Sequence, residues 1–116
     1  MDKYNSLFNQ KRYYDEETVS FSNNSLGDNA YTLAESLCLR LINIGNAYEI
    51  HYLSMIDIYG MTKLNKNQIL SLIEELLFVK SIVNDELIEK IVPGLTELLE
   101  KISRSKNEEF LWIIGN

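Results

Sequence analysis

The chain has 116 residues, of which 46% are hydrophobic and 24% are charged, and its formal net charge is -6. This size and composition predict one domain that buries a core without help from metals or disulfides. The acidic balance argues against direct nucleic-acid binding, which needs Lys and Arg to meet phosphates. It favours a basic protein partner.

Cellular location is constrained by what the sequence lacks. Cys38 is the single cysteine, so an intramolecular disulfide is excluded, and its apolar neighbours predict a small buried side chain. The first ten residues carry no secretory signal pattern, and the apolar runs are too short to cross a bilayer. We therefore expect a cytoplasmic protein that makes no membrane contact.

The N-terminal part of the predicted domain, residues 1–28, has the composition of a small β-hairpin. Lys11–Tyr14 is the first candidate strand, and Thr18–Ser22 alternates with period two and is rich in β-branched and aromatic residues. Asp15-Glu16-Glu17 would form the polar turn between them.

A helical core is predicted for residues 29–104, and its first stretch, residues 29–61, is apolar nearly all round. One helix of that length would be longer than a compact globule of this size allows. Gly45-Asn46 is the expected break, giving two helices at about 29–44 and 47–59 or one kinked helix. The competing interpretation is a long helix that protrudes into a dimer.

Two further helices follow a connection at residues 60–64. Asn65 and Gln68 form a capping box for a helix at about 66–82. Asp85 and Glu86 suit the start of the next helix, which carries a clean apolar face and is expected to kink at Pro93.

The C-terminal part, residues 105–116, allows two interpretations. Ser105 and Glu108 form a capping box that favours a last helix. Phe110–Ile114 has the composition of a strand, which could extend the N-terminal hairpin. The predicted fold is therefore mainly α: a compact bundle of four to five helices with a small N-terminal β-hairpin, which a C-terminal strand could join.

Chemical motifs are scarce. His51 is the single histidine and the five glycines are dispersed, so the sequence predicts no metal site, no phosphate-binding loop and no cofactor. His51 could act as a general base, but a lone helical histidine more often has a structural role. No nucleophile or orienting acid is placed for it by sequence spacing.

Two sets of tyrosines are candidates for binding a partner. Tyr13 and Tyr14 stand next to Asp15, Glu16 and Glu17, which combines anchoring rings with charge that would steer a basic partner. The equally weighted alternative is a solvated turn whose tyrosines cover the helices. The second set lies on one predicted helical stripe together with Met55 and consists of Tyr48, Tyr52 and Tyr59. Core packing is the favoured interpretation of that stripe, and a partner-binding face is the alternative.

The leading functional hypothesis is a small, non-enzymatic, acidic protein of the immunity or inhibitor type. It would neutralise a basic partner, such as a nuclease, by occlusion, with carboxylates in the place of phosphates and tyrosines as anchors. The first alternative is a homodimeric adaptor or regulatory protein. The second is a small enzyme that uses His51 with a tyrosine or a carboxylate.

Overall fold

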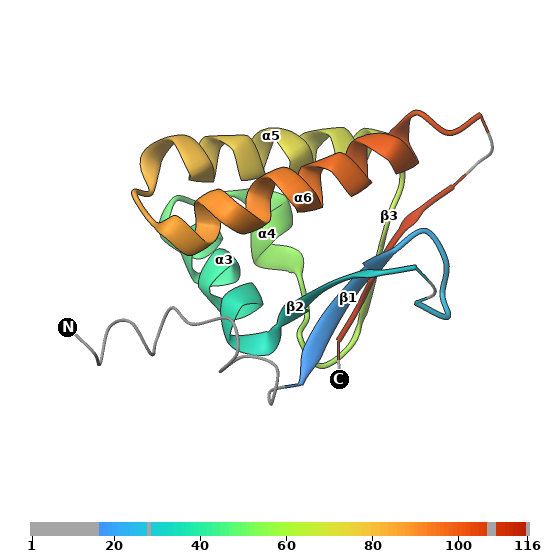
Figure 1. Ribbon diagram of the computed structural model, residues 1–116, viewed down its shortest axis with the longest axis horizontal. Coiled ribbons are helices and arrows are strands. Elements are labelled where there is room, and N and C mark those ends of the chain that lie inside the picture. Colours follow the sequence, from blue (N-terminus) through green and yellow to red (C-terminus); the bar gives the residue numbers. More distant parts are fainter. Residues whose placement is uncertain (1–16, 28, 107–108, 116) are drawn as a thin grey trace.

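The computed structural model describes residues 17–27, 29–106 and 109–115. These residues form, in chain order, β1 (Thr18–Ser22), β2 (Tyr31–Ala34), α3 (Glu35–Ala47), α4 (His51–Met55), β3 (Met61–Leu64), α5 (Lys66–Ile82), α6 (Glu86–Ser103) and β4 (Leu111–Ile114). The strands make an antiparallel sheet in the order β2-β1-β4-β3. The helices gather on one side of that sheet, with α5 and α6 side by side (Figure 1).

The predicted fold class is wrong. A helical bundle was expected, whereas the described residues form a mixed α/β fold with a four-stranded antiparallel sheet. The sheet gains two strands, β2 and β3, in places where the sequence predicted part of a helix and a connection. Both strands have four residues, too few to distinguish a period of two from a period of 3.6.

Strand β2 shows how pairing overrides an apparent helical pattern. Its residues pair with β1 in a register that sets Leu33 opposite Val19 and Tyr31 opposite Phe21. Helix α3 begins only at Glu35, whose N–H donates to the Glu17 carbonyl at 2.9 Å. The backbone groups of 31–34 are thus satisfied by a neighbouring strand rather than by a helix.

The two ends of the described chain meet in the sheet. The strand predicted at Thr18–Ser22 is confirmed, but its predicted partner, Lys11–Tyr14, lies outside the described residues. Strand β1 pairs instead with β2 and with β4. The strand alternative for the C-terminal tail is therefore the correct one, and β4 lies between β1 and β3 with Leu111 and Ile113 fully buried.

The middle of the chain breaks later than predicted. Helix α3 continues through Gly45 and ends at Ala47, so the break expected at Gly45-Asn46 is wrong, and so is a single long helix over residues 29–61. The chain turns at Glu49, which has a left-handed φ of 57°. Helix α4 then spans only His51–Met55 instead of residues 47–59.

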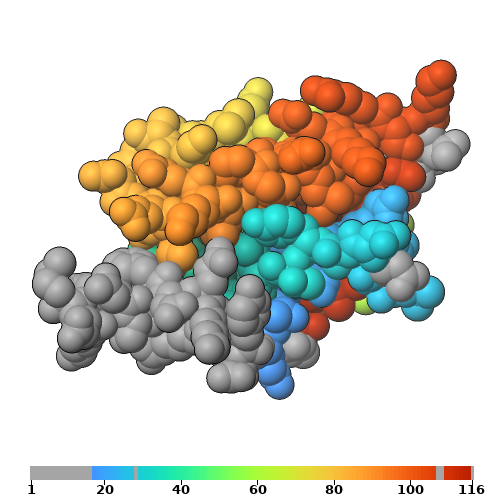
Figure 2. Space-filling view, viewed as in Figure 1, coloured from blue at the N-terminus to red at the C-terminus, as the bar shows by residue number. Residues whose placement is uncertain are grey.

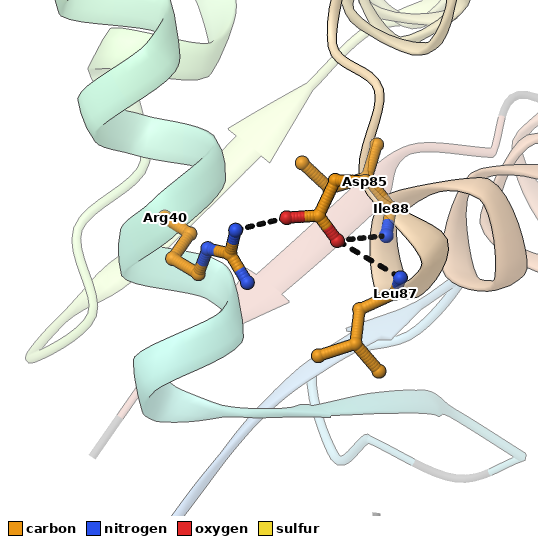
Figure 3. A network of polar contacts seen from close by, with 4 residues as sticks. All are labelled: Arg40, Asp85, Leu87 and Ile88. Carbon is orange, nitrogen blue, oxygen red and sulfur yellow. Dashed lines mark hydrogen bonds and ion pairs between the residues drawn. The ribbon is translucent and has the colours of Figure 1, made fainter. Parts of the chain in front are cut away.

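The two helices predicted after residue 64, α5 and α6, are confirmed together with the residues that cap them. The Gln68 N–H donates to Asn65 Oδ1 at 2.9 Å, and the Asn65 N–H donates to Gln68 Oε1 at 2.8 Å, which completes the capping box of α5. Helix α6 is continuous through Pro93. Asp85 caps α6 and also forms an ion pair with Arg40 of α3 (Figure 3).

The core lies between the sheet and the helices. Its largest fully buried side chains come from strands β1, β3 and β4 and from all four helices of the described chain. They are Phe21, Leu41, Leu53, Leu64, Ile69, Leu72, Leu76, Leu87, Ile88, Leu95, Leu99 and Leu111. Burying a leucine or phenylalanine side chain contributes about 1.5–3 kcal/mol, so this cluster dominates the stability of the fold.

Cys38 is part of this core, as predicted, with 0% of its surface exposed. Burial, together with the nearby negative charge of Glu35, raises the pKa of the Cys38 thiol from 9.0 to about 12. The folded state therefore keeps the thiol protonated at pH values where the unfolded chain releases the proton.

We expect this difference to make the fold sensitive to alkali. Because the unfolded chain binds fewer protons, Cys38 should lower the free energy of unfolding by about 1.4 kcal/mol per pH unit between roughly pH 9 and 12. Below pH 9 its contribution is fully present and constant. Urea unfolding at several pH values should give a steeper alkaline slope for the wild type than for Cys38→Ala. Equal slopes for the two proteins would contradict the prediction. The half-buried Tyr31 phenol, whose pKa is also raised by its partial burial, contributes equally to both proteins.

Candidate functional site

The structure separates the predicted binding residues. Tyr13, Tyr14, Asp15 and Glu16 lie outside the described residues, and Glu17 is exposed just before β1. The second set does not form one helical stripe, because the chain leaves helical geometry between α3 and α4 and again after Met55.

The tyrosines of the second set are more exposed than core packing would make them. Tyr48 is 55% exposed and Tyr59 is 71% exposed, while Tyr52 is half-buried. Tyr59 lies in the turn before β3, where its N–H donates to Asp57 Oδ1 at 2.8 Å. Tyr48 and Tyr52 flank the junction between α3 and α4, so they are the pair on which a common surface can be built.

Helix α5 contributes the third ring of this surface. The rings of Tyr48 and Phe78 have centroids 6.0 Å apart at an interplanar angle of 83°, an edge-to-face contact. His51 and Tyr52 make a similar contact, at 4.8 Å and 77°. We call these four residues, Tyr48, His51, Tyr52 and Phe78, the aromatic cluster. Edge-to-face pairs contribute about 0.5–1.5 kcal/mol beyond the area they bury, so the rings are held in place.

Glu75 links the elements that carry the two ring pairs, because it lies on α5 with Phe78 and bonds to α4, which carries His51 and Tyr52. Its carboxylate accepts hydrogen bonds from the backbone N–H groups of Tyr52 (3.0 Å) and Leu53 (2.8 Å). The residue before α4, Ile50, has no side-chain acceptor for these groups. Glu75 therefore caps α4 from α5. Because Phe78 follows Glu75 by three residues, it projects from the same side of α5.

Acidic side chains border the aromatic cluster. Glu49 is exposed next to Tyr48, and Glu74 is exposed on α5 one turn before Phe78. The half-buried Glu75 adds a third carboxylate, and the exposed Lys80 follows Phe78 by two residues on α5, so three acids stand against one base. The surface thus combines exposed rings with a negative rim, which suits a partner with a positive surface.

His51 is exposed at the first position of α4. Within the described part of the chain, its ring contacts that of Tyr52, and no side chain hydrogen-bonds its imidazole.

The sequence did not predict the role of Phe78. It lies off the inner stripe of α5, where Ile69, Leu72, Ile73, Leu76 and Val79 are buried. An aromatic residue outside a complete apolar stripe is the signal that could have identified it as a surface anchor. Its contact with Tyr48, thirty residues earlier, depends on tertiary packing and was not visible in local patterns.

No family model matches the chain, and no curated protein or solved structure matches it. Among residues 17–27, 29–106 and 109–115, no group of three or more His, Cys, Asp or Glu side chains is placed to hold a metal ion. In the same residues, no helix has the length and apolar character needed to cross a bilayer. The feature of the described chain that bears on function is the aromatic cluster with its acidic rim.

Proposed function

We propose that this chain is a small acidic protein-binding protein of the immunity or inhibitor type. It acts in the cytoplasm and neutralises a basic partner, such as a nuclease, by covering the surface that the partner uses. The observation that carries the proposal is the aromatic cluster, in which half-exposed and exposed rings lie beside Glu49 and Glu74.

Occlusion needs two physical contributions, and the cluster can supply both. The rings offer large apolar area with few rotatable bonds, so they can anchor an interface at low entropic cost. The carboxylates, together with the net charge of -6, would attract a basic surface and speed its association. Carboxylates that occupy the place of phosphates would compete with an acidic substrate of the partner.

The experiment compares the wild type with the double variant Tyr48→Ala/Phe78→Ala. The first partner to test is the product of the reading frame next to this gene, co-expressed and purified with the full chain. We expect a complex with a basic protein whose affinity falls by about 2 kcal/mol or more, roughly thirtyfold, in the double variant.

Leu26→Ala is the matched control, since Leu26 is also an exposed apolar residue, 83% exposed, but lies in the loop between β1 and β2. It should leave the affinity unchanged. Raising the salt concentration from about 0.05 to 0.5 M should weaken the complex, because exposed charges are screened. A partner that binds the double variant as tightly as the wild type, or whose affinity is indifferent to salt, would contradict the proposal.

A further inference from the structure

The outward face of α5 carries large apolar side chains among its polar ones, whereas the outward face of its neighbour α6 carries none. Leu70, Leu77 and Phe78 are 51%, 50% and 44% exposed. In the described chain, the large exposed apolar side chains include none from α6, whose exposed positions are Glu86, Glu89, Lys90, Pro93, Glu97 and Lys101. The two helices form one continuous band in the space-filling view, α5 in yellow and α6 in orange (Figure 2).

The outer face of α6 is suited to contact with water, whereas the outer face of α5 leaves large apolar side chains without a packing partner in the described chain. Both helices bury a full inner stripe against the fold, so packing within the chain does not require the outer leucines of α5. Large apolar side chains on the outer face of a helix expose surface that water disfavours. Contiguous exposed apolar residues of this kind mark interaction sites.

The spacing on α5 specifies the shape of the occupant. Leu70, Glu74, Leu77 and Ser81 follow one another in steps of four, three and four, and all are exposed. This is the repeat by which one helix packs along another at a shallow angle. We call these four residues the α5 seam. Phe78 is adjacent to the seam and belongs to the aromatic cluster, so the two surfaces are continuous.

The charge on the seam specifies the chemistry of the occupant. Glu74 stands between Leu70 and Leu77, so a helix covering both leucines also covers its carboxylate. A covered carboxylate is strongly destabilising unless a cation pairs with it. A second copy of this chain packed through the same seam would bring Leu70, Glu74, Leu77 and Ser81, which include no cation. Lys66, one turn before Leu70, already donates a hydrogen bond from its ammonium group to the Ser105 carbonyl.

We propose that the α5 seam binds an amphipathic helix of a protein partner that places a Lys or Arg opposite Glu74. This inference rests on the proposed function, in that it describes the segment by which a basic partner would be held. The leucines would supply apolar contact and Glu74 would set register and select against acidic or neutral helices.

The test uses two synthetic helix-forming peptides of about 20 residues, long enough to be helical when bound. Both carry leucines at seam spacing, and they differ only in one central residue, Lys in the first peptide and Glu in the second. Binding to the full chain is measured by calorimetry and located by backbone NMR shifts. We expect the Lys peptide to bind about tenfold tighter than the Glu peptide, with shifts centred on α5.

Variants of exposed residues keep the fold intact and sharpen the result. Glu74→Lys should invert the preference between the two peptides, and Leu77→Gln should weaken both by about tenfold. Glu97→Lys on α6 reverses an acidic charge on a polar face and should change neither. Each variant is checked for native NMR dispersion before use.

Three outcomes would overturn the inference: peptides that bind equally well, shifts that lie away from α5, and a wild-type dimer that Leu77→Gln converts to a monomer. The last would make a second copy the occupant. Failure here is distinct from failure of the proposed function. If Tyr48→Ala/Phe78→Ala loses a basic partner that Leu77→Gln retains, the proposal for the α5 seam alone is wrong. If the peptides bind as expected but no protein partner depends on the aromatic cluster, the proposed function alone is wrong.

Discussion

Replacing Gly45 with alanine is expected to lower the free energy of unfolding by about 1–3 kcal/mol, although alanine is the better helix former. A Cβ at this position would lie 2.8 Å from Leu53 Cβ and 3.2 Å from the backbone nitrogen of Ser54. Leu53 is 1% exposed and part of the core, so it has no room to retreat. The backbone of α4 would have to move away from α3.

Helix propensity and packing predict changes of opposite sign in the free energy of unfolding of Gly45→Ala, so the measurement distinguishes between them. Propensity alone predicts a gain of about 1 kcal/mol for a helical Gly→Ala substitution. Urea unfolding of Gly45→Ala decides between them, with Asn46→Ala as the control at the exposed neighbouring position of the same helix. The control should stay within about 0.5 kcal/mol of the wild type. A Gly45→Ala protein as stable as the wild type would show that α4 is not held as closely as described.

A second readout links this contact to the candidate site. Displacing α4 would pull the Tyr52 and Leu53 N–H groups away from the Glu75 carboxylate. We therefore expect faster hydrogen exchange of these two amides in Gly45→Ala than in Asn46→Ala. Because Tyr52 belongs to the aromatic cluster, the same variant should also weaken the binding that we propose for it.

Sequence patterns predicted the elements that are long and capped. Helix α5 matched in its start, its capping box at Asn65 and Gln68, and its inner stripe. Helix α6 matched in its acidic start and in remaining one helix across Pro93, while the kink expected at Pro93 stays a prediction. In both helices several local signals agree over about five turns, so tertiary contacts do not override the local preference for a helix.

The short strands could not be predicted in the same way. Strand β2 owes its conformation to pairing with β1, and strand β3 owes its conformation to pairing with β4. Helices α5 and α6 separate β3 from β4 in the sequence. Gly45 was read as a helix terminator because glycine often ends helices, but its role here is to let α4 approach. A single sequence does not distinguish these two uses of a glycine.

The candidate site was predicted in part, for the same physical reason. Tyr48 and Tyr52 were identified by residue type, but the assumed helix that joined them to Tyr59 does not exist. The contacts that define the aromatic cluster, to Phe78 and through Glu75, cross from one helix to another. Residue chemistry can nominate members of such a surface, whereas their assembly depends on the packing of α4 against α5.

Replacing Asp85 with alanine is expected to have the largest effect among the polar substitutions, about 2–3 kcal/mol of unfolding free energy. One carboxylate oxygen accepts from the N–H groups of Leu87 (2.9 Å) and Ile88 (3.3 Å), and the other accepts from the Arg40 guanidinium (Figure 3). The Asp85 side chain is 8% exposed, so water cannot replace these partners without a shift of the chain. The variant loses the cap of α6 and the link between α6 and α3 together.

The asparagine variant separates the two contributions. Asp85→Asn keeps an oxygen that can cap α6 but loses the charge that pairs with Arg40, so it should cost about 1 kcal/mol less than Asp85→Ala. A double-mutant cycle with Arg40→Ala then isolates the ion pair, since Arg40 is 39% exposed and its removal leaves the cap in place. Equal losses for Asp85→Ala and Asp85→Asn would show that the cap contributes nothing. A coupling energy of zero would show that Arg40 and Asp85 act independently. When both the cap and the ion pair contribute, they fix the first turn of α6 against α3. Helix α6, which covers the core beside α5, is thereby held at its N-terminal end.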